Sequence, residues 1–227
     1  MSSELKRIAA ESAVELVKDG DIVGLGTGST AYFAIRALGE RIKREGLRIK
    51  AIPTSADTRI HALKFGIPTT TFEEFEQVDI AIDGADQISR KLELIKGGGG
   101  ALFREKVVAS NARRFIVIAD ESKLVERLSM PVPVEVLPFA WRVAERWLVK
   151  IGAGATNLRS CRGKVGPLLT DNGNYIIDAD FGEVAQPERL EQEINRIVGV
   201  LENGIFPSRM VSEVHLGTRE GVKILRP

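Results

Sequence analysis

Residues 78–106 read VDIAIDGADQISRKLELIKGGGGALFREK, and this stretch decides the fold. It contains two short apolar runs, Val78–Ile82 and Leu92–Ile95, each followed by polar residues or glycines, and then a helical pattern that carries Glu105. Short apolar runs of this kind are typical of buried strands in parallel sheets, where ligands bind beyond the carboxyl ends of the strands. We therefore expect an α/β fold in which the polar groups after both runs lie at one edge of a parallel sheet.

These polar groups are Asp83, Asp86, Lys96, the run Gly97–Gly100 and Glu105. Taken alone, the D-x-x-D pair also fits a solvated turn or a divalent-metal site, although no histidine or third acid stands near it. Lys96 alone also fits a surface lysine, and Glu105 a first-turn acid favoured by the helix dipole. Four glycines in a row are harder to explain without a ligand, because glycine costs chain entropy in regular structure. Together the groups indicate proton transfer on a small polar, phosphorylated substrate, with no metal required.

Composition and charge narrow the class of protein. The 32 basic and 31 acidic side chains leave a net charge of +1, which argues against a general nucleic-acid or anionic-membrane binder and favours a small-molecule partner. Cys161 is the only cysteine, so an intrachain disulfide is impossible and a reducing compartment is expected. The N-terminus is a charged amphipathic pattern and no run approaches the ~20 apolar residues of a membrane span. We predict a cytoplasmic protein.

A second glycine-rich segment, Gly26–Thr30, follows the predicted strand Ile22–Leu25 and precedes a predicted helix over Ala31–Arg44. Backbone N–H groups, the helix dipole and the hydroxyls of Thr27, Ser29 and Thr30 would suit a phosphate, although a plain tight turn has the same outline. A dinucleotide site is disfavoured. Gly24, Gly26 and Gly28 give G-x-G-x-G instead of G-x-G-x-x-G, and no acid ends the second strand, Arg48–Ile52.

The composition changes at Met130-Pro131-Val132-Pro133, where two prolines suit an edge strand or a domain crossing. The pattern beyond it is strand, helix, strand, strand, helix, strand, which is the ferredoxin-like arrangement. We predict a Rossmann-like parallel-sheet domain over residues 1–129, completed by 208–227, and a smaller ferredoxin-like α+β domain over 130–207. The other predicted elements are helices over about 3–18, 55–65, 139–151 and 187–197, and strands over 67–71, 115–119, 132–137, 155–159, 166–169, 175–179, 199–201, 210–216 and 222–225.

Four motifs read in order carry a resemblance to a known family: GLGTGST (24–30), IDGADQ (82–87), IKGGGGALFREK (95–106) and IADESKLV (118–125). With them the chain resembles type A ribose-5-phosphate isomerases along its whole length. The resemblance implies a Rossmann-like sheet with a ferredoxin-like domain. It also implies interconversion of D-ribose 5-phosphate and D-ribulose 5-phosphate in the non-oxidative pentose phosphate pathway, without a cofactor. Assembly as a homodimer or homotetramer is implied in the same way.

The resemblance also implies residue roles. Glu105 matches the proton-transfer base and Lys123 a substrate-binding lysine. Our reading of the chemistry adds Asp83 for ring opening, in preference to Asp86, and Lys96 for the enediolate oxygen. Gly100 and Phe103 depart from the alanine and threonine expected there, which affects only the fine shape of the loop. The implied substrate-binding residues are Thr27, Gly28, Ser29, Thr30, Asp83, Gly84, Ala85, Asp86, Lys96, Gly97, Gly98, Gly99 and Lys123.

Two rival functions are consistent with the same fold. A regulatory sugar-phosphate-binding domain would bind without turnover, but it would normally carry a DNA-binding helix-turn-helix and would not need Glu105 and Lys96 together. An amino-sugar phosphate deaminase or a lactonase would act on another sugar and would rely on a histidine in the site. His61 and His215 lie outside the loops singled out above, and we interpret both as structural.

Overall fold

The computed structural model describes residues 2–161, 163 and 165–227. The chain forms two compact units. The first comprises the chain up to Ala85 together with Arg104–Leu124 and Ser208–Pro227, and the second comprises Asp86–Phe103 and Val125–Pro207. Residues 86–103 thus group with the second unit, whereas the predicted boundaries assigned them to the first. None of the helices within the described residues has both the length and the apolarity of a membrane-spanning segment.

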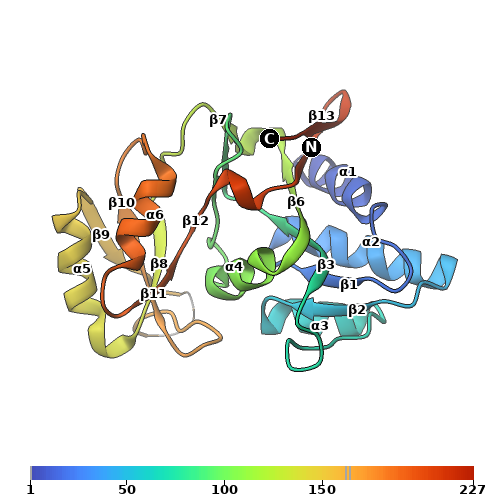
Figure 1. Ribbon diagram of the computed structural model, residues 1–227, viewed down its shortest axis with the longest axis horizontal. Coiled ribbons are helices and arrows are strands. Elements are labelled where there is room, and N and C mark those ends of the chain that lie inside the picture. Colours follow the sequence, from blue (N-terminus) through green and yellow to red (C-terminus); the bar gives the residue numbers. More distant parts are fainter. Residues whose placement is uncertain (1, 162, 164) are drawn as a thin grey trace. The chain divides into compact units, whose positions relative to one another are not determined.

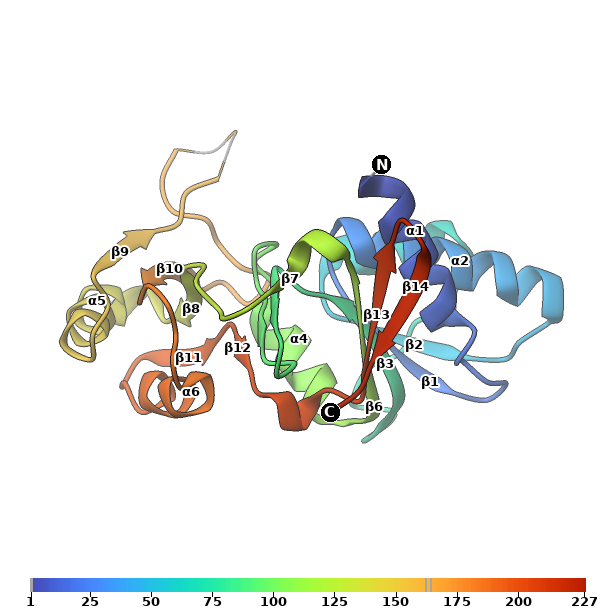
Figure 2. The same ribbon diagram turned by 90° about the horizontal axis from the view of Figure 1, so that it is seen from above.

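The first unit is built on one six-stranded sheet with the order β14-β13-β6-β3-β1-β2. Its first five strands in sequence run parallel, and only the last is antiparallel. Figure 2 shows the C-terminal hairpin in red, at the edge where β13 pairs with β6, so the predicted return of the chain end to the first sheet is confirmed. The strands are β1 (Ile22–Leu25), β2 (Lys50–Pro53), β3 (Val78–Gly84), β6 (Ala112–Asp120), β13 (Glu213–Thr218) and β14 (Gly221–Leu225).

Helices cover both faces of this sheet, because apolar side chains alternate between the faces along each strand. On one face, α1 (Ser2–Val14) and α2 (Ser29–Glu45) lie side by side over a core that includes strand residues such as Ile80 and Ile82 (Figure 1). The intervening Ala81 points to the opposite face, where α4 (Leu102–Ser110) packs. The remaining helix, α3 (Ala56–Lys64), follows β2 and contacts α2.

His215 of β13 is buried beneath α1. Its Nδ1 lies 2.9 Å from Ser12 Oγ, and its Nε2 lies 3.2 Å from the Glu213 carboxylate. Burial lowers the pKa of His215 below its ordinary value and outweighs the interaction with Glu213, which raises it. Burial raises the pKa of Glu213, but the hydrogen bond from His215 and the charges of Arg226 and Arg114 together lower it. The fold therefore favours a neutral imidazole beside an ionised carboxylate.

This arrangement predicts how stability depends on pH. The folded pKa of His215 is depressed, so its contribution is fully present above the unfolded pKa of about 6.5 and is lost as pH falls through the folded pKa. We expect the free energy of unfolding to fall between about pH 7 and pH 5, and His215→Gln to remove much of that slope. Urea unfolding at several pH values checks this. Equal slopes of the free energy of unfolding against pH in both proteins over that window would contradict the prediction. The loss of stability due to protonation of Glu213, below about pH 4.5, should remain in the variant.

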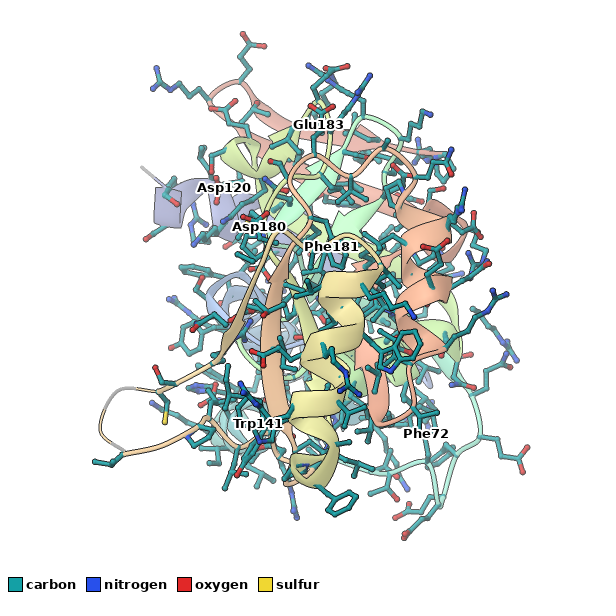
Figure 3. The ribbon with its side chains drawn as sticks, turned by 90° about the vertical axis from the view of Figure 1, so that its left-hand side faces the viewer. Phe72, Asp120, Trp141, Asp180, Phe181 and Glu183 are labelled. Atoms are coloured by element: carbon teal, nitrogen blue, oxygen red, sulfur yellow. The ribbon has the colours of Figure 1, made fainter. Side chains whose placement is uncertain are left out.

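The second unit contains a four-stranded antiparallel sheet with the order β11-β8-β10-β9. Two helices separate its strands in the sequence, so the succession is strand, helix, strand, strand, helix, strand, and the predicted fold class is confirmed. Figure 3 shows Trp141 at one end of α5, with Asp180 and Phe181 beyond the other end. The elements are β8 (Val132–Val136), α5 (Trp141–Lys150), β9 (Ala155–Leu158), β10 (Tyr175–Asp180), α6 (Pro187–Asn195) and β11 (Val200–Asn203).

Three strand predictions are wrong. The run at 92–95 does not join the parallel sheet: β5 (Leu94–Ile95) lies in a small sheet, antiparallel to β4 (Gln87–Ser89) and β12 (Ile205–Phe206), with β7 (Leu124–Val125) at its edge. Periodicity cannot reveal which sheet so short a run joins. The strands predicted at 67–71 and 166–169 are reduced to the single bridges Ala51↔Thr69 and Ser160↔Pro167. Both segments contain a proline, which has no N–H for a ladder.

Candidate active site

The loop after β1 lies where the winding of the parallel sheet reverses direction. β1 pairs with β2 on one side and with β3 on the other, and in open α/β sheets such a switch point is where ligands bind. The carboxyl ends of β1, β3 and β6 therefore bring three predicted groups to one edge of the first unit: the loop Gly26–Thr30, the pair Asp83–Gly84 and the turn that carries Lys123.

Asp83 is locked against the first glycine loop. The residue is only 3% exposed, and its Oδ1 accepts hydrogen bonds from the N–H groups of Thr27 at 3.2 Å and Gly84 at 2.7 Å. A Cβ atom added to Gly26 would lie 1.9 Å from Asp83 Oδ1, so only glycine permits this approach. Gly84 in turn lies beside Thr30. Position 26 must therefore be glycine, because any side chain there would prevent the Asp83 carboxylate from packing directly against the loop.

A network of hydroxyl groups shapes the same loop. Thr27 Oγ1 lies 2.8 Å from Thr54 Oγ1, 2.8 Å from Ser55 Oγ and 3.0 Å from Thr58 Oγ1. Thr58 Oγ1 also donates to the carbonyl of Gly26 at 2.8 Å. The side chain of Thr27 was predicted to face an anion. Its hydroxyl instead contacts the hydroxyls of Thr54, Ser55 and Thr58, and these contacts fix the conformation of the loop.

The start of α2 presents backbone N–H groups next to a positive charge. Its N-cap residue, Gly28, has φ +113° and no side chain to cap the first turn, whose N–H groups point out of the end of the helix. Lys6 Nζ of α1 donates to Ser29 Oγ at 3.0 Å. This end of α2 is suited to an anion, because the helix dipole and the ammonium group act in the same direction.

Glu105 lies on α4 and is only 3% exposed. It lines one small recess of the first unit together with Gly24, Gly26, Thr54 and Asp83. Both predicted carboxylates therefore face the same space beside the glycine loop. A side chain on Gly24 would collide with Val108 of α4, so this glycine lets α4 approach the strand that precedes the loop.

In the second unit, Lys96 is 2% exposed and follows β5. Its backbone N–H donates to the carbonyl of Gly204 at 2.9 Å, and its Nζ lies 5.3 Å from the centre of the Phe206 ring. Gly204 leaves room for this contact, since a Cβ there would lie 2.2 Å from the Lys96 carbonyl oxygen. Lys96 is therefore held at two points, by the backbone hydrogen bond to Gly204 and by the cation–π contact of its ammonium group with Phe206.

The glycine run 97–100 is folded on itself and on Asp86. Gly98 N–H donates to Asp86 Oδ2 at 2.8 Å, and Gly100 N–H donates to the carbonyl of Gly97 at 3.0 Å. Gly97 has φ +102°, and a Cβ there would lie 2.8 Å from Leu102 Cβ. The structure thus brings Asp86, Gly97 and Gly98 together, whereas Asp83 belongs to the other unit.

Comparison with known proteins establishes the relationship. The family model described as ribose 5-phosphate isomerase A (phosphoriboisomerase A) matches residues 50–221. The chain is 48% identical to ribose-5-phosphate isomerase A of Archaeoglobus fulgidus over 227 residues, covering 99% of this chain and 100% of that protein. The chain belongs to the ribose 5-phosphate isomerase A family. The resemblance carried by the four motifs is thereby confirmed.

Solved structures of ribose-5-phosphate isomerases have the same fold. The structure from Methanocaldococcus jannaschii superimposes with a TM-score of 0.94 at 49% identity, covering 99% of both chains. A D-ribose-5-phosphate isomerase in complex with phospho-erythronic acid gives 0.96 at 43% identity, covering all of both chains. Residence in the cytoplasm and assembly as a homodimer or homotetramer remain predictions for this member of the family.

Two features of this ribose 5-phosphate isomerase A family member were missed in the sequence. Lys6 lies 23 residues before Ser29 in an ordinary amphipathic helix, and nothing in that pattern marks it. The hydroxyls of Thr54, Ser55 and Thr58 had a weak signal in the sequence, because the segment after β2 lies at the same sheet edge as the glycine loop.

His61, which we interpret as structural from the sequence, packs on Tyr32 with ring centroids 4.9 Å apart.

Proposed function

We propose that this chain interconverts D-ribose 5-phosphate and D-ribulose 5-phosphate by moving a proton between C1 and C2 through an enediol. The observation that carries this proposal is the close grouping of two buried carboxylates, Glu105 and Asp83, beside the glycine loop that precedes the N-terminus of α2. The relative solved with phospho-erythronic acid supports a phosphorylated sugar as the class of substrate.

The phosphate binds at the loop Gly26–Thr30. The N–H groups at the start of α2 and the hydroxyls of Ser29 and Thr30 donate to its oxygens, and Lys6 and Lys123 supply positive charge. Binding energy from this non-reacting group holds the sugar in place, so the reacting carbons are oriented at little further entropic cost.

Proton transfer requires one base and one group that stabilises negative charge. Glu105 takes the proton from C2 and returns it to C1, and a buried carboxylate suits this because water cannot compete for it. Lys96 donates to the oxygen that becomes negative in the enediolate, together with N–H groups of the loop Gly97–Gly99. The N–H of Gly98 already donates to Asp86, so the Lys96 ammonium group supplies most of this stabilisation.

Ring opening precedes isomerisation, because the sugar enters mainly as a furanose. Asp83 receives the proton of the anomeric hydroxyl and returns it to the ring oxygen. We assign this role to Asp83 because it shares the recess with Glu105 and because Asp86 is engaged with Gly98. The hydrogen bonds from Thr27 and Gly84 to Oδ1 fix the orientation of the carboxylate.

Activity should survive exhaustive chelation, since proton transfer by a carboxylate with an ammonium group as electrophile needs no metal. Purified protein is treated with EDTA, desalted, and assayed for ribulose 5-phosphate formed from ribose 5-phosphate. We expect turnover within about twofold of the untreated enzyme. Loss of turnover that a divalent ion restores would instead support a metal bound by the D-x-x-D pair.

The same assay tests the proposed reaction against its rivals. Turnover supports the isomerase. Tight binding of ribose 5-phosphate without turnover would replace it with the regulatory-domain function. Turnover of an amino-sugar phosphate or a lactone, with none of ribose 5-phosphate, would replace it with another enzyme of the same fold.

A further inference from the structure

Arg159, at the end of β9, reaches from the antiparallel sheet of the second unit to the glycine run. Its Nη1 donates to the carbonyl of Gly97 at 2.7 Å and to that of Gly98 at 3.3 Å. The other side of the same guanidinium forms a bidentate pair with Asp178 of β10, in which Nε donates to Oδ2 at 2.9 Å and Nη2 donates to Oδ1. One side chain thus connects a rigid sheet to a segment of four glycines.

The contacts fix the orientation of a peptide group. The carbonyl of Gly97 and the N–H of Gly98 belong to one planar trans peptide unit and point in opposite directions. Arg159 holds the carbonyl end and Asp86 holds the N–H end at 2.8 Å, so this unit is restrained from both sides. The next carbonyl, of Gly98, is also drawn towards Arg159, and the N–H of Gly99 is therefore turned away from it.

Burial makes the restraint strong. The side chains of Arg159 and Asp178 are 15% and 23% exposed, so solvent weakens their interaction little. Both residues line a cavity of about 470 Å³ that Asp86 and Gly98 also line. The restraint therefore acts on a part of the glycine loop that borders open space within its own unit, where small rotations of a peptide group would change which donors a ligand meets.

We propose that Arg159, oriented by Asp178, is a positioning residue that holds the glycine loop in the conformation needed for isomerisation. The proposal rests on the function proposed above, and it concerns a residue that contacts loop carbonyls and not the reacting atoms. Glycines have the largest conformational freedom of any residues, so a loop of four needs an external restraint to keep its donors aligned. Arginine suits the task because its planar fork serves a carboxylate and two carbonyls at once.

The test compares Arg159→Met with Arg127→Met. Arg127 pairs with Glu183 on the surface of the same unit and provides the same loss of charge away from the loop. For Arg159→Met we expect kcat to fall by at least about tenfold, the usual worth of a charge-assisted hydrogen bond, with KM changed less than about threefold. Arg159→Lys, which keeps the charge but not the fork, should recover part of the loss. Arg127→Met should match wild type.

Amide hydrogen exchange in the peptide covering residues 96–102 tests the restraint without any assay of activity. Exchange should be faster in Arg159→Met and in Asp178→Asn, and unchanged in Arg127→Met. Asp178→Asn keeps the shape of the site and serves if the methionine variant does not fold. Unchanged exchange with kcat within twofold of wild type overturns the proposal. A wild-type protein without isomerase activity, but with a loop that loosens in both variants, refutes the proposed function alone.

Discussion

Glu105→Gln should bind ribose 5-phosphate nearly as tightly as wild type and lower kcat by at least about 10²-fold, the usual worth of a positioned general base. Glutamine has almost the same shape, so the recess formed with Gly26 and Asp83 should remain filled. It cannot accept a proton at neutral pH, and the transfer between C2 and C1 would lose its carrier. Steady-state kinetics give kcat, and calorimetric titration of the slow variant gives the affinity.

A second measurement separates loss of the base from loss of structure. In D2O, wild-type enzyme should introduce deuterium from solvent at the exchanged carbon, whereas Glu105→Gln should introduce almost none while still binding substrate. Glu40→Gln is the matched control, because Glu40 is an exposed residue of α2 whose partner is Arg36. Turnover of Glu105→Gln within tenfold of wild type would remove Glu105 from the role of base.

The elements of the parallel sheet were predictable because each carries a local signal. β1 and β3 are short apolar runs followed by glycine or acidic residues, and α2 begins directly after the glycine loop that follows β1. The second unit was predictable from the order of its strands and helices. The DNGN segment at 171–174, for example, is a turn pattern that marks the start of β10. These features depend on neighbours in sequence, which is why the fold class followed from the chain alone.

Contacts between residues far apart in sequence were not predictable. Lys6 and Ser29 lie 23 residues apart, and Arg159 lies 62 residues after Gly97. No pattern within one helix or strand marks such a pair, because each residue is an ordinary polar residue of its own segment. The same reason explains β5: its two apolar residues satisfy the pattern of a buried strand equally well in a parallel or an antiparallel sheet.

Gly26→Ala should abolish most activity although it adds only a methyl group. The new Cβ would lie 1.9 Å from Oδ1, 2.0 Å from Cγ and 2.5 Å from Cβ of Asp83, so either the carboxylate or the loop must move. Asp83 is only 3% exposed and is tied to the N–H groups of Thr27 and Gly84, which leaves it little room to yield. We expect kcat/KM to fall by at least about 10²-fold, because displacing the loop affects phosphate binding and ring opening together.

The stability of the same variants tests the physical cause. Overpacking at Gly26 should lower the free energy of unfolding by about 1–3 kcal/mol. Gly154→Ala is the matched control, because its added Cβ would come no nearer than 3.9 Å to the Asp180 carbonyl oxygen and should cost little. Removing the whole obstructing side chain, Cβ included, in Gly26→Ala/Asp83→Gly should recover part of the lost stability without recovering activity, a non-additive result expected only if the two groups collide. Additive losses of stability in the double variant, or wild-type turnover in Gly26→Ala, would mean that the close approach of Asp83 to the loop does not govern the site.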